Sequence, residues 1–280
     1  MTVVSPTRLD EALAAVAVDP SLAVIAGGTD LMVALNAGRE RPAGLLSLRR
    51  VDELRGWRRD GDDLVIGAGV TYAELLDPAL AELAPGLAQA ARTVGSPQIR
   101  NTGTLGGNLA TASPAGDTLP MLAALDARIE VAAVSDRRVV PIDSFLTGPK
   151  RTALRPGELV VSVRIPVADG PQEYLKIGVR NAMVIAVASC ALVVCWSRRR
   201  VACACGSVGP TPVRNRQAEG WLIGEVDWDA RRLRSRAAAE RFGRSLARTS
   251  RPIDDHRAPA AYRREAVRVL VTRALNRAFP

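Results

Sequence analysis

Apolar residues in the first part of the chain switch repeatedly between helical and strand spacing. Leu9, Leu13 and Val16 fall on one face of a helix, whereas the run at 159–166 alternates apolar and polar side chains as a half-buried strand does. The same reasoning predicts further helices at 31–35 and 78–92, and strands at 23–26, 64–68, 129–134 and 139–141. Helices and strands mixed in this way indicate an α+β fold.

Residues 94–117 follow neither spacing. The segment is dense in glycine, asparagine, threonine, serine and proline, and we expect it to form a long loop. A loop of this length within a compact domain usually serves a function. This segment is therefore the first place to search for a site.

Beyond Gly170-Pro171, which we interpret as a linker, the order of the elements changes. The pattern there predicts strands near 174–179, 184–194 and 201–208, followed by helices at about 214–223, 229–248 and 259–278. Strands followed by helices are typical of an α+β unit. We expect one domain over residues 1–170, made of two α+β subdomains that divide near residue 55, and a second over 171–280 with three antiparallel strands and helices.

Composition argues against several classes of protein. The longest apolar run, 182–196, is short for a membrane span, and the first residues lack a secretory signal. We therefore expect a cytoplasmic chain without membrane contact. The cysteines at 190, 195, 203 and 205 form no Cys-x-x-Cys pair, and His256 is the single histidine. Free buried thiols are thus expected, with no metal site in this chain.

The net positive charge of the chain comes from its second part. Residues 1–170 hold 17 basic and 20 acidic side chains, whereas residues 171–280 hold 21 basic and 9 acidic ones, a net charge of +12. This asymmetry predicts either an acidic partner or simply an arginine-rich, solvated surface. The basic clusters have few aromatic residues between them on which bases could stack, so we expect no nucleic-acid binding.

Two glycine pairs carry the first chemical signal, Gly27-Gly28 and Gly106-Gly107. A diphosphate needs several hydrogen-bond donors, and backbone amides can approach it where no Cβ atom intervenes. The hydroxyls of Thr29 and Thr104 are placed to add donors. Asp30 would repel a diphosphate, and we expect its side chain to point away and bond the backbone at a helix start. Each pair alone is also an ordinary structural turn.

A Rossmann dinucleotide site is disfavoured. The nearest glycine cluster, at 67–72, lacks the third glycine of the G-x-G-x-x-G fingerprint. No acidic residue follows it at the usual distance within a clear βαβ unit.

The run from Arg100 to Asp117 is more specific. It closely resembles the signature of the FAD-binding subunits of molybdenum hydroxylases, the family of the xanthine dehydrogenase flavin domain and of the medium subunit of aerobic carbon monoxide dehydrogenase. The first turn, AGGTDL at 26–31, is similar to that family's N-terminal diphosphate loop. Further segments that resemble the family lie at 151–158, 206–214 and 262–264.

The resemblance implies an FAD-binding domain of the vanillyl-alcohol-oxidase-like (PCMH) type and a set of cofactor-binding positions. The diphosphate would lie between two groups of residues, Ile25, Ala26, Gly27, Gly28, Thr29, Asp30 and Leu31 on one side and Thr104, Gly106, Gly107 and Asn108 on the other. Positions along the ribityl chain and the sugar hydroxyls would be Thr111, Ser113 and Asp117. Positions near the flavin ring or the domain border would be Val94, Val160 and Lys176. The two valines could equally be plain core, and Lys176 a surface lysine.

Two departures from related proteins refine the expectation. Residues 1–189 contain no histidine or cysteine, so the FAD of this chain should be held without a covalent bond. The same absence disfavours the benzoyl-CoA reductase branch of the family, whose flavin subunit carries an additional cysteine-bound cluster. Catalytic acids, bases and nucleophiles are not expected, because the cofactor supplies the reactive chemistry.

The function implied is that of an oxidoreductase subunit. Electrons would come from a molybdopterin centre on a large subunit, through [2Fe-2S] clusters on a small subunit, to FAD on this chain. FAD would then reduce NAD⁺ or another acceptor. A xanthine dehydrogenase-like complex, a dimer of heterotrimers, is the favoured form. The alternative is a stand-alone FAD-dependent oxidase of the same fold.

Overall fold

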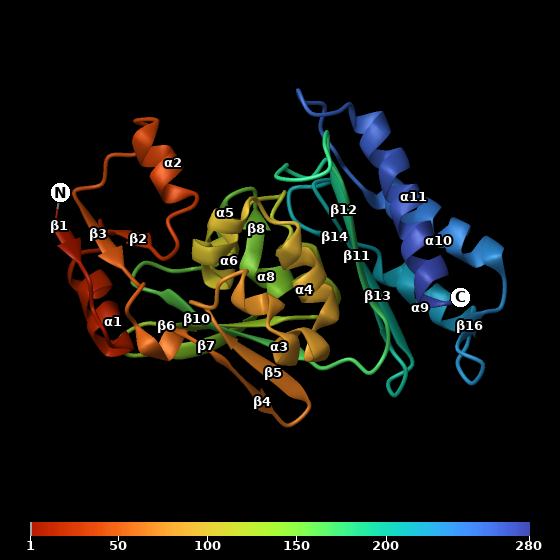
Figure 1. The fold of residues 1–280 in the computed structure, drawn as a ribbon, viewed down its shortest axis with the longest axis horizontal. Helices are drawn as coiled ribbons and strands as arrows, with labels where there is room; N and C mark the ends of the chain where they lie inside the picture. Colours follow the sequence, from red (N-terminus) through yellow and green to blue (C-terminus); the bar gives the residue numbers. More distant parts are fainter. Residues whose placement is uncertain (1) are drawn as a thin grey trace.

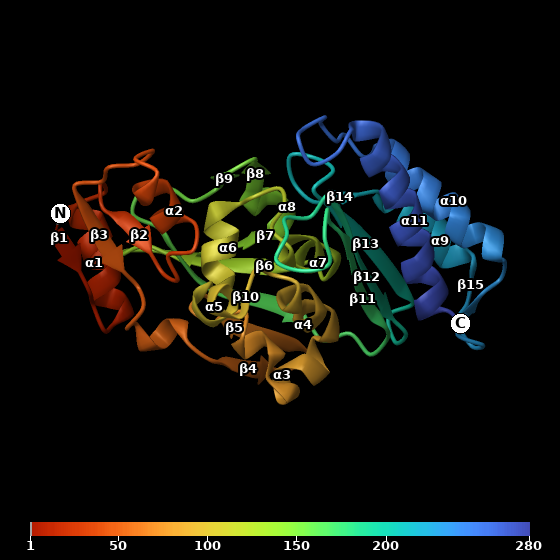
Figure 2. The same ribbon diagram turned by 45° about the horizontal axis from the view of Figure 1, so that its top comes forward.

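The computed structural model describes residues 2–280 and shows three main sheets that follow one another along the long axis of the molecule (Figure 1). A small sheet lies at the N-terminal end, a five-stranded sheet in the centre, and a four-stranded sheet with long helices at the C-terminal end. The second view keeps the same order (Figure 2). The expected α+β architecture is confirmed.

The N-terminal sheet is parallel, with the order β1-β3-β2. Its elements are β1 (Thr2–Val4), α1 (Leu9–Val18), β2 (Ala23–Ile25), α2 (Leu31–Asn36) and β3 (Gly44–Ser47). Helix α1 buries Leu9, Ala12, Leu13 and Val16, as the apolar spacing predicts. Helix α2 has no fully buried residue, and Leu31, Ala34 and Leu35 are half-buried.

The central sheet is antiparallel, with the order β4-β5-β10-β6-β7. Its strands are β4 (Trp57–Asp60), β5 (Asp63–Gly67), β6 (Arg128–Ala132), β7 (Arg137–Pro141) and β10 (Leu159–Pro166). The helices and short elements around it are η1 (Asp52–Leu54), η2 (Glu74–Leu76), α3 (Pro78–Leu83), α4 (Pro85–Arg92), α5 (Pro97–Thr102), α6 (Leu105–Thr111), α7 (Thr118–Ala124), α8 (Ile142–Phe145), β8 (Leu146–Gly148) and β9 (Arg151–Thr152).

Two sequence-based expectations for this part were wrong. The predicted helix at 78–92 is two helices, because Pro85 forces Ala84 out of the helical region, to φ −137° and ψ 60°. The predicted loop at 94–117 contains α5 and α6. The side chains of Ser96 and Thr104 cap these two helices, so residues that are typical of loops act here as helix starts.

The C-terminal sheet is antiparallel, with the order β11-β12-β13-β14. Its elements are β11 (Gln172–Ile177), β12 (Ala188–Cys195), β13 (Arg200–Gly206), β14 (Val213–Arg214), α9 (Arg216–Gly224), β15 (Val226–Asp227), β16 (Arg232–Leu233), α10 (Arg236–Thr249) and α11 (Ala260–Ala278). The three predicted strands are present, with β14 as a short fourth. The helix predicted from 229 begins only at 236, because the β15–β16 hairpin comes first and Ser235 caps the helix.

This sheet joins two cores. One face, with Ala191, Val193 and Ala204, packs into the same core as the central sheet. The other face packs on α10 and α11 in a separate core, and both helices cover it in Figure 1. At the junction, Asp126 accepts hydrogen bonds from Arg200 and Arg214. Within residues 2–280, no helix is long and apolar enough to cross a membrane.

Candidate cofactor-binding site

Both glycine pairs line one cavity of about 690 Å³ between the N-terminal sheet and the central sheet. The backbone of Gly27 lies against the segment just before the second pair: a Cβ atom added to Gly27 would lie 1.9 Å from the Thr102 carbonyl oxygen and 2.8 Å from Cα of Gly103. Glycine is therefore required at position 27 for the two segments to approach. The sequence placed the two pairs 79 residues apart, and the fold brings them together.

The first turn offers backbone donors. Gly28, at φ +71°, reverses the chain after β2, a conformation that glycine adopts at little cost. Within residues 2–280, five successive amides donate no hydrogen bond to a protein group, those of Gly27, Gly28, Thr29, Asp30 and Leu31. All five residues line the cavity. A run of unpaired amides beside a cavity is a site for an anion such as a diphosphate.

The second turn differs, and the expectation of free amides there was wrong. Its amides are already bonded, Leu105 to the Val70 carbonyl at 2.9 Å and Gly106 to the Ala68 carbonyl at 2.8 Å. The Gly107 amide donates to the hydroxyl oxygen of Thr104 at 3.0 Å. The segment is thus fixed on β5 and the turn that follows it, and the amides of Leu105, Gly106 and Gly107 are not free to bind a ligand.

Side chains supply the donors on this wall instead. The Thr104 hydroxyl accepts from Gly107, which leaves its own proton for a ligand oxygen. The side-chain carbonyl of Asn108 accepts from the Thr118 hydroxyl at 2.6 Å, an arrangement that leaves the NH₂ group of Asn108 as a donor. Thr111 lines the cavity as well. The second wall therefore presents two hydroxyls and one amide.

Asp30 does not play the expected part. It precedes α2, but its side chain makes no capping hydrogen bond, and the residue lines the cavity. The Asp30 carboxylate disfavours the ionised form of the buried phenol of Tyr72, which also lines the cavity. Burial, together with the carboxylates of Asp30 and Asp117, raises the pKa of Tyr72. A carboxylate side chain therefore lies near the place where a diphosphate would bind.

Sequence reasoning missed much of the cavity wall. Arg49 and Arg55 contribute cationic side chains, and Tyr72 contributes a phenol. The remaining wall is mainly apolar and includes Val51, Leu54, Leu154 and Leu159, with the predicted Val160 beside them. Isolated arginines and leucines carry no motif, so only the fold could assign them. A mostly apolar cavity with a few polar groups is typical of a cofactor site.

Four of the predicted positions lie outside this cavity: Val94, Ser113, Asp117 and Lys176. Three of them gather at the border with the C-terminal sheet. The Lys176 ammonium donates to the Asp117 carboxylate at 2.6 Å and to the carbonyl of Thr93, next to Val94, at 3.1 Å. Ser113 lies apart and accepts from the Ala115 amide at 3.3 Å.

The ion pair of Lys176 with Asp117, at the border with the C-terminal sheet, is buried. Both side chains are 8% exposed, so Lys176 is not the surface lysine of the alternative interpretation. Burial raises the pKa of Asp117, although Lys176 and the hydroxyl of Tyr174 stabilise the ionised form. A buried ion pair of this kind is costly unless its hydrogen bonds are satisfied. Here the bonds from Lys176 and Tyr174 tie β11 to the end of the 94–117 segment.

The donor set and the cavity fit the diphosphate and an apolar ring system of a dinucleotide. Comparison with known proteins identifies the family and, with it, the dinucleotide FAD. Residues 1–168 match the family described as the FAD-binding domain in molybdopterin dehydrogenase, and residues 173–278 match the CO dehydrogenase flavoprotein C-terminal domain.

Individual relatives agree. The chain is 31% identical to the carbon monoxide dehydrogenase medium chain of Hydrogenophaga pseudoflava, over 91% of this chain and 88% of that one. It is 32% identical to the glyceraldehyde dehydrogenase medium chain of Sulfolobus acidocaldarius, over 96% and 94%. It is also 32% identical to a putative xanthine dehydrogenase FAD-binding subunit of Escherichia coli, over 75% of each.

Solved structures share the fold over almost the whole chain. Quinoline 2-oxidoreductase from Pseudomonas putida superposes with a TM-score of 0.91 at 26% identity, covering 99% of this chain and 96% of that one. Carbon monoxide dehydrogenase from Hydrogenophaga pseudoflava gives 0.90 at 30% identity, with the same coverage. This chain therefore belongs to the family of FAD-binding subunits of molybdenum hydroxylases.

Proposed function

We propose that this chain binds FAD in the cavity described above, without a covalent bond, and carries electrons within a molybdenum hydroxylase complex. The observation that supports this most directly is the row of five unpaired amides at Gly27–Leu31, which faces the side-chain donors of Thr104 and Asn108. FAD, when bound, takes up electrons singly and gives them up as a pair.

The proposed division of labour follows from the geometry of the walls. The amides at 27–31 neutralise part of the diphosphate charge, and Thr104 and Asn108 donate from the other side. Val160 and the apolar residues around it exclude water from a ring system. The donors are positioned before the ligand arrives, because Thr104 is fixed by the Gly107 amide and Asn108 by Thr118.

Three of the remaining predicted positions belong to the border between the proposed domains, 1–170 and 171–280. We propose that Val94 and Lys176 lie near the flavin ring or the domain border, and that Ser113 and Asp117 lie along the ribityl chain and the sugar hydroxyls. Lys176 then holds a positive charge in a buried place and influences how readily the flavin is reduced. A Lys176→Met variant should shift the visible flavin spectrum and its potential, whereas Lys150→Met, an exposed lysine outside the cavity, should change neither.

Partners and acceptor are part of the same proposal. The family implies a large molybdopterin-binding subunit and a small [2Fe-2S] subunit, which we propose form a cytoplasmic dimer of heterotrimers with this chain. We propose a xanthine dehydrogenase-like complex that reduces NAD⁺. The relatives act, by their names, on carbon monoxide, glyceraldehyde, nicotinate and xanthine, and the substrate is chosen on the large subunit.

Affinity purification of the full chain from its own host tests this function. The expected result is yellow protein with close to one FAD per chain, together with two further subunits that contain molybdenum and iron. The complex should reduce NAD⁺ when a purine is supplied. A colourless chain would refute the FAD site, and a yellow chain without partners would favour the stand-alone oxidase. A complex active only on another substrate would refute the xanthine-like form alone.

A further inference from the structure

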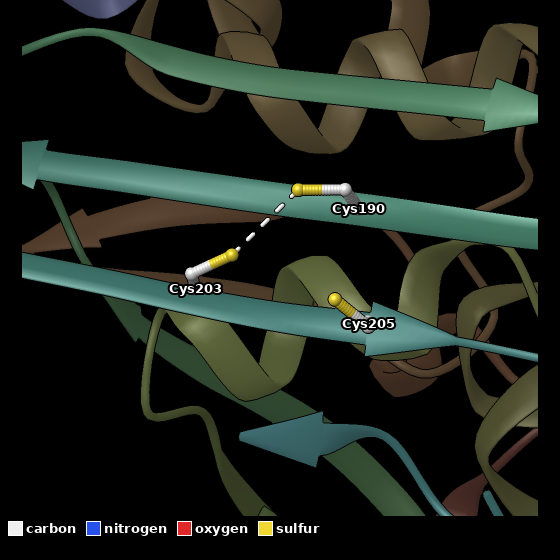
Figure 3. Close-up of side chains that lie close together, drawn as sticks. All are labelled: Cys190, Cys203 and Cys205. Carbon is white, nitrogen blue, oxygen red and sulfur yellow. Dashed lines mark hydrogen bonds between the residues drawn. The ribbon is translucent and has the colours of Figure 1, made fainter. Parts of the chain in front are cut away.

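Three of the four cysteines lie close together inside the C-terminal domain, although their spacing in the sequence matches no metal-binding motif. Cys190 on β12 lies directly opposite Cys205 on β13. Cys203 is two residues before Cys205, so its side chain leaves the same face of the sheet. Figure 3 shows the three sulfur atoms turned toward one another across the two strands.

The sulfur positions match the size of a three-coordinate site. All three Sγ atoms lie within 4.8 Å of one another, and those of Cys190 and Cys203 are 3.6 Å apart. An ion bound by three thiolates at about 2.3 Å, the length of a zinc–sulfur bond, holds its sulfur atoms roughly 4 Å apart. Only small side-chain rotations therefore separate the observed triangle from a ligated one.

The environment of the triangle restricts the charge it can hold. All three residues are 0% exposed and belong to the core under α10 and α11. Within residues 2–280, the sulfur atoms receive no hydrogen bond from a lysine or arginine side chain. Hydrogen bonding to Cys190 and Cys205, with burial, raises the pKa of the Cys203 thiol. An ion bound here must leave the site close to neutral, because an unpaired charge in an apolar core is costly.

We propose that Cys190, Cys203 and Cys205 form a binding site for a soft, three-coordinate trivalent ion, with arsenic(III) as the matching chemistry. Arsenite reacts with three thiols to give an arsenic atom with three As–S bonds and three water molecules. The three thiol protons and the three arsenite hydroxyls leave as that water. No electron is transferred, and both the empty and the occupied site are uncharged.

Other thiophilic ions fit less well. A structural zinc ion takes four ligands, and the group of candidate ligands found among the described residues has three members. Monovalent copper suits thiolates, but with three of them it would leave two negative charges in the core. The neutral arsenic complex avoids this cost.

Entry to the site requires a local opening. The thiols are covered by α10 and α11, so arsenite can reach them only when these helices move away or before they pack. Loading of the folded chain should therefore be slow and should accelerate in mild denaturant. Cys195 is the internal control, because it lies in the same strand with its side chain on the opposite face and its sulfur contacts Ser197 at 3.5 Å.

The test uses the full chain with FAD bound, incubated with sodium arsenite, desalted and weighed by native mass spectrometry. The parent and Cys195→Ser should each retain one arsenic atom per chain, with the loss of three hydrogens. In Cys203→Ser and Cys190→Ser we expect occupancy to fall by more than about tenfold, since even the loss of an outer-shell partner typically costs 10–100-fold in metal affinity. Circular dichroism and a urea midpoint close to those of the parent show that the C-terminal domain of each variant is folded.

A second measurement keeps the proposal open to refutation if a variant fails to fold. In the parent chain, arsenite should protect the three clustered thiols from an alkylating reagent, while Cys195 reacts at an unchanged rate. Two outcomes would overturn the proposal: no arsenic retained by the folded parent after loading in mild denaturant, or equal retention by Cys203→Ser. Retention of cuprous copper in preference to arsenite would overturn the charge argument on which the choice of ion rests.

Discussion

The two glycine turns look alike in sequence but work differently. The turn at 27–28 presents five unpaired amides, and its backbone touches Thr102 and Gly103. The turn at 106–107 has bonded amides and presents side-chain donors. Apart from the backbone of its own helix, a Cβ atom at Gly107 would meet one atom within 4 Å, the Thr104 hydroxyl oxygen at 3.0 Å. Gly27 is thus needed by the protein itself, and so is Gly106, where a Cβ atom would lie 2.6 Å from Cβ of Ala68. Gly107 is the member of the second pair whose missing side chain leaves room for a ligand.

The largest effect should come from Gly27→Ala. Its methyl group cannot share space with the Thr102 carbonyl oxygen 1.9 Å away, so the two segments must separate. Overpacking typically costs about 1–3 kcal/mol. We expect a lower free energy of unfolding in urea for the apo chain, and no FAD retained on desalting. Parent-like stability would show that the first turn is not held by this contact.

Gly107→Val tests the other half of the comparison. Its side chain would point into the cavity and little else. We expect FAD content to fall to background in the absorbance ratio of flavin to protein. The urea midpoint of the apo chain should fall less than in Gly27→Ala, because the Cβ atom meets a side-chain hydroxyl at 3.0 Å rather than a backbone carbonyl at 1.9 Å. FAD content equal to that of the parent would refute the cavity as the diphosphate site.

A smaller effect is expected from Thr104→Val, which removes the acceptor of the Gly107 amide and a donor to the ligand. Losing a helix N-cap costs roughly 1 kcal/mol, and the lost ligand contact should weaken FAD binding by a further ~1 kcal/mol, or about fivefold. Thr104→Ser keeps the hydroxyl and is the matched control. Flavin fluorescence titration and thermal unfolding distinguish the two contributions. FAD binding by Thr104→Val as tight as that of the parent would refute a hydrogen bond from this hydroxyl to the cofactor.

The difference between the two turns also shows which features of the site could be predicted from the sequence. Gly27, Gly107 and Thr104 were placed in one site from local spacing and the family resemblance, and they line one cavity. The bonded state of the second turn was not predictable, because its acceptors are the carbonyls of Ala68 and Val70, which come from a distant segment. Tertiary partners decide whether an amide is free, and local sequence does not record them.

The same reason accounts for the other errors. Pro85 visibly breaks a helix once its effect on Ala84 is considered, so that correction was available in the sequence. The cysteine triangle was not available, since it depends on the pairing register of β12 with β13. The ion pair of Lys176 with Asp117 joins residues 59 positions apart, and sequence could name both members only through the family.

The smallest effect should come from Asp30→Asn, which addresses the one feature of the first turn that opposes an anion. Asp30 lines the cavity and makes no capping bond, so its removal costs the fold little. The residue is exposed, and water screens charges there to about 1 kcal/mol or less. We expect FAD to bind up to roughly fivefold more tightly at low salt, with the gain lost at high salt because screening removes the repulsion.

Asp136→Asn makes the same change of charge at an exposed position outside the cavity and should leave binding unchanged. Weaker binding in Asp30→Asn would mean that the carboxylate accepts a hydrogen bond from the cofactor, and that the first turn recognises a hydroxyl as well as the diphosphate.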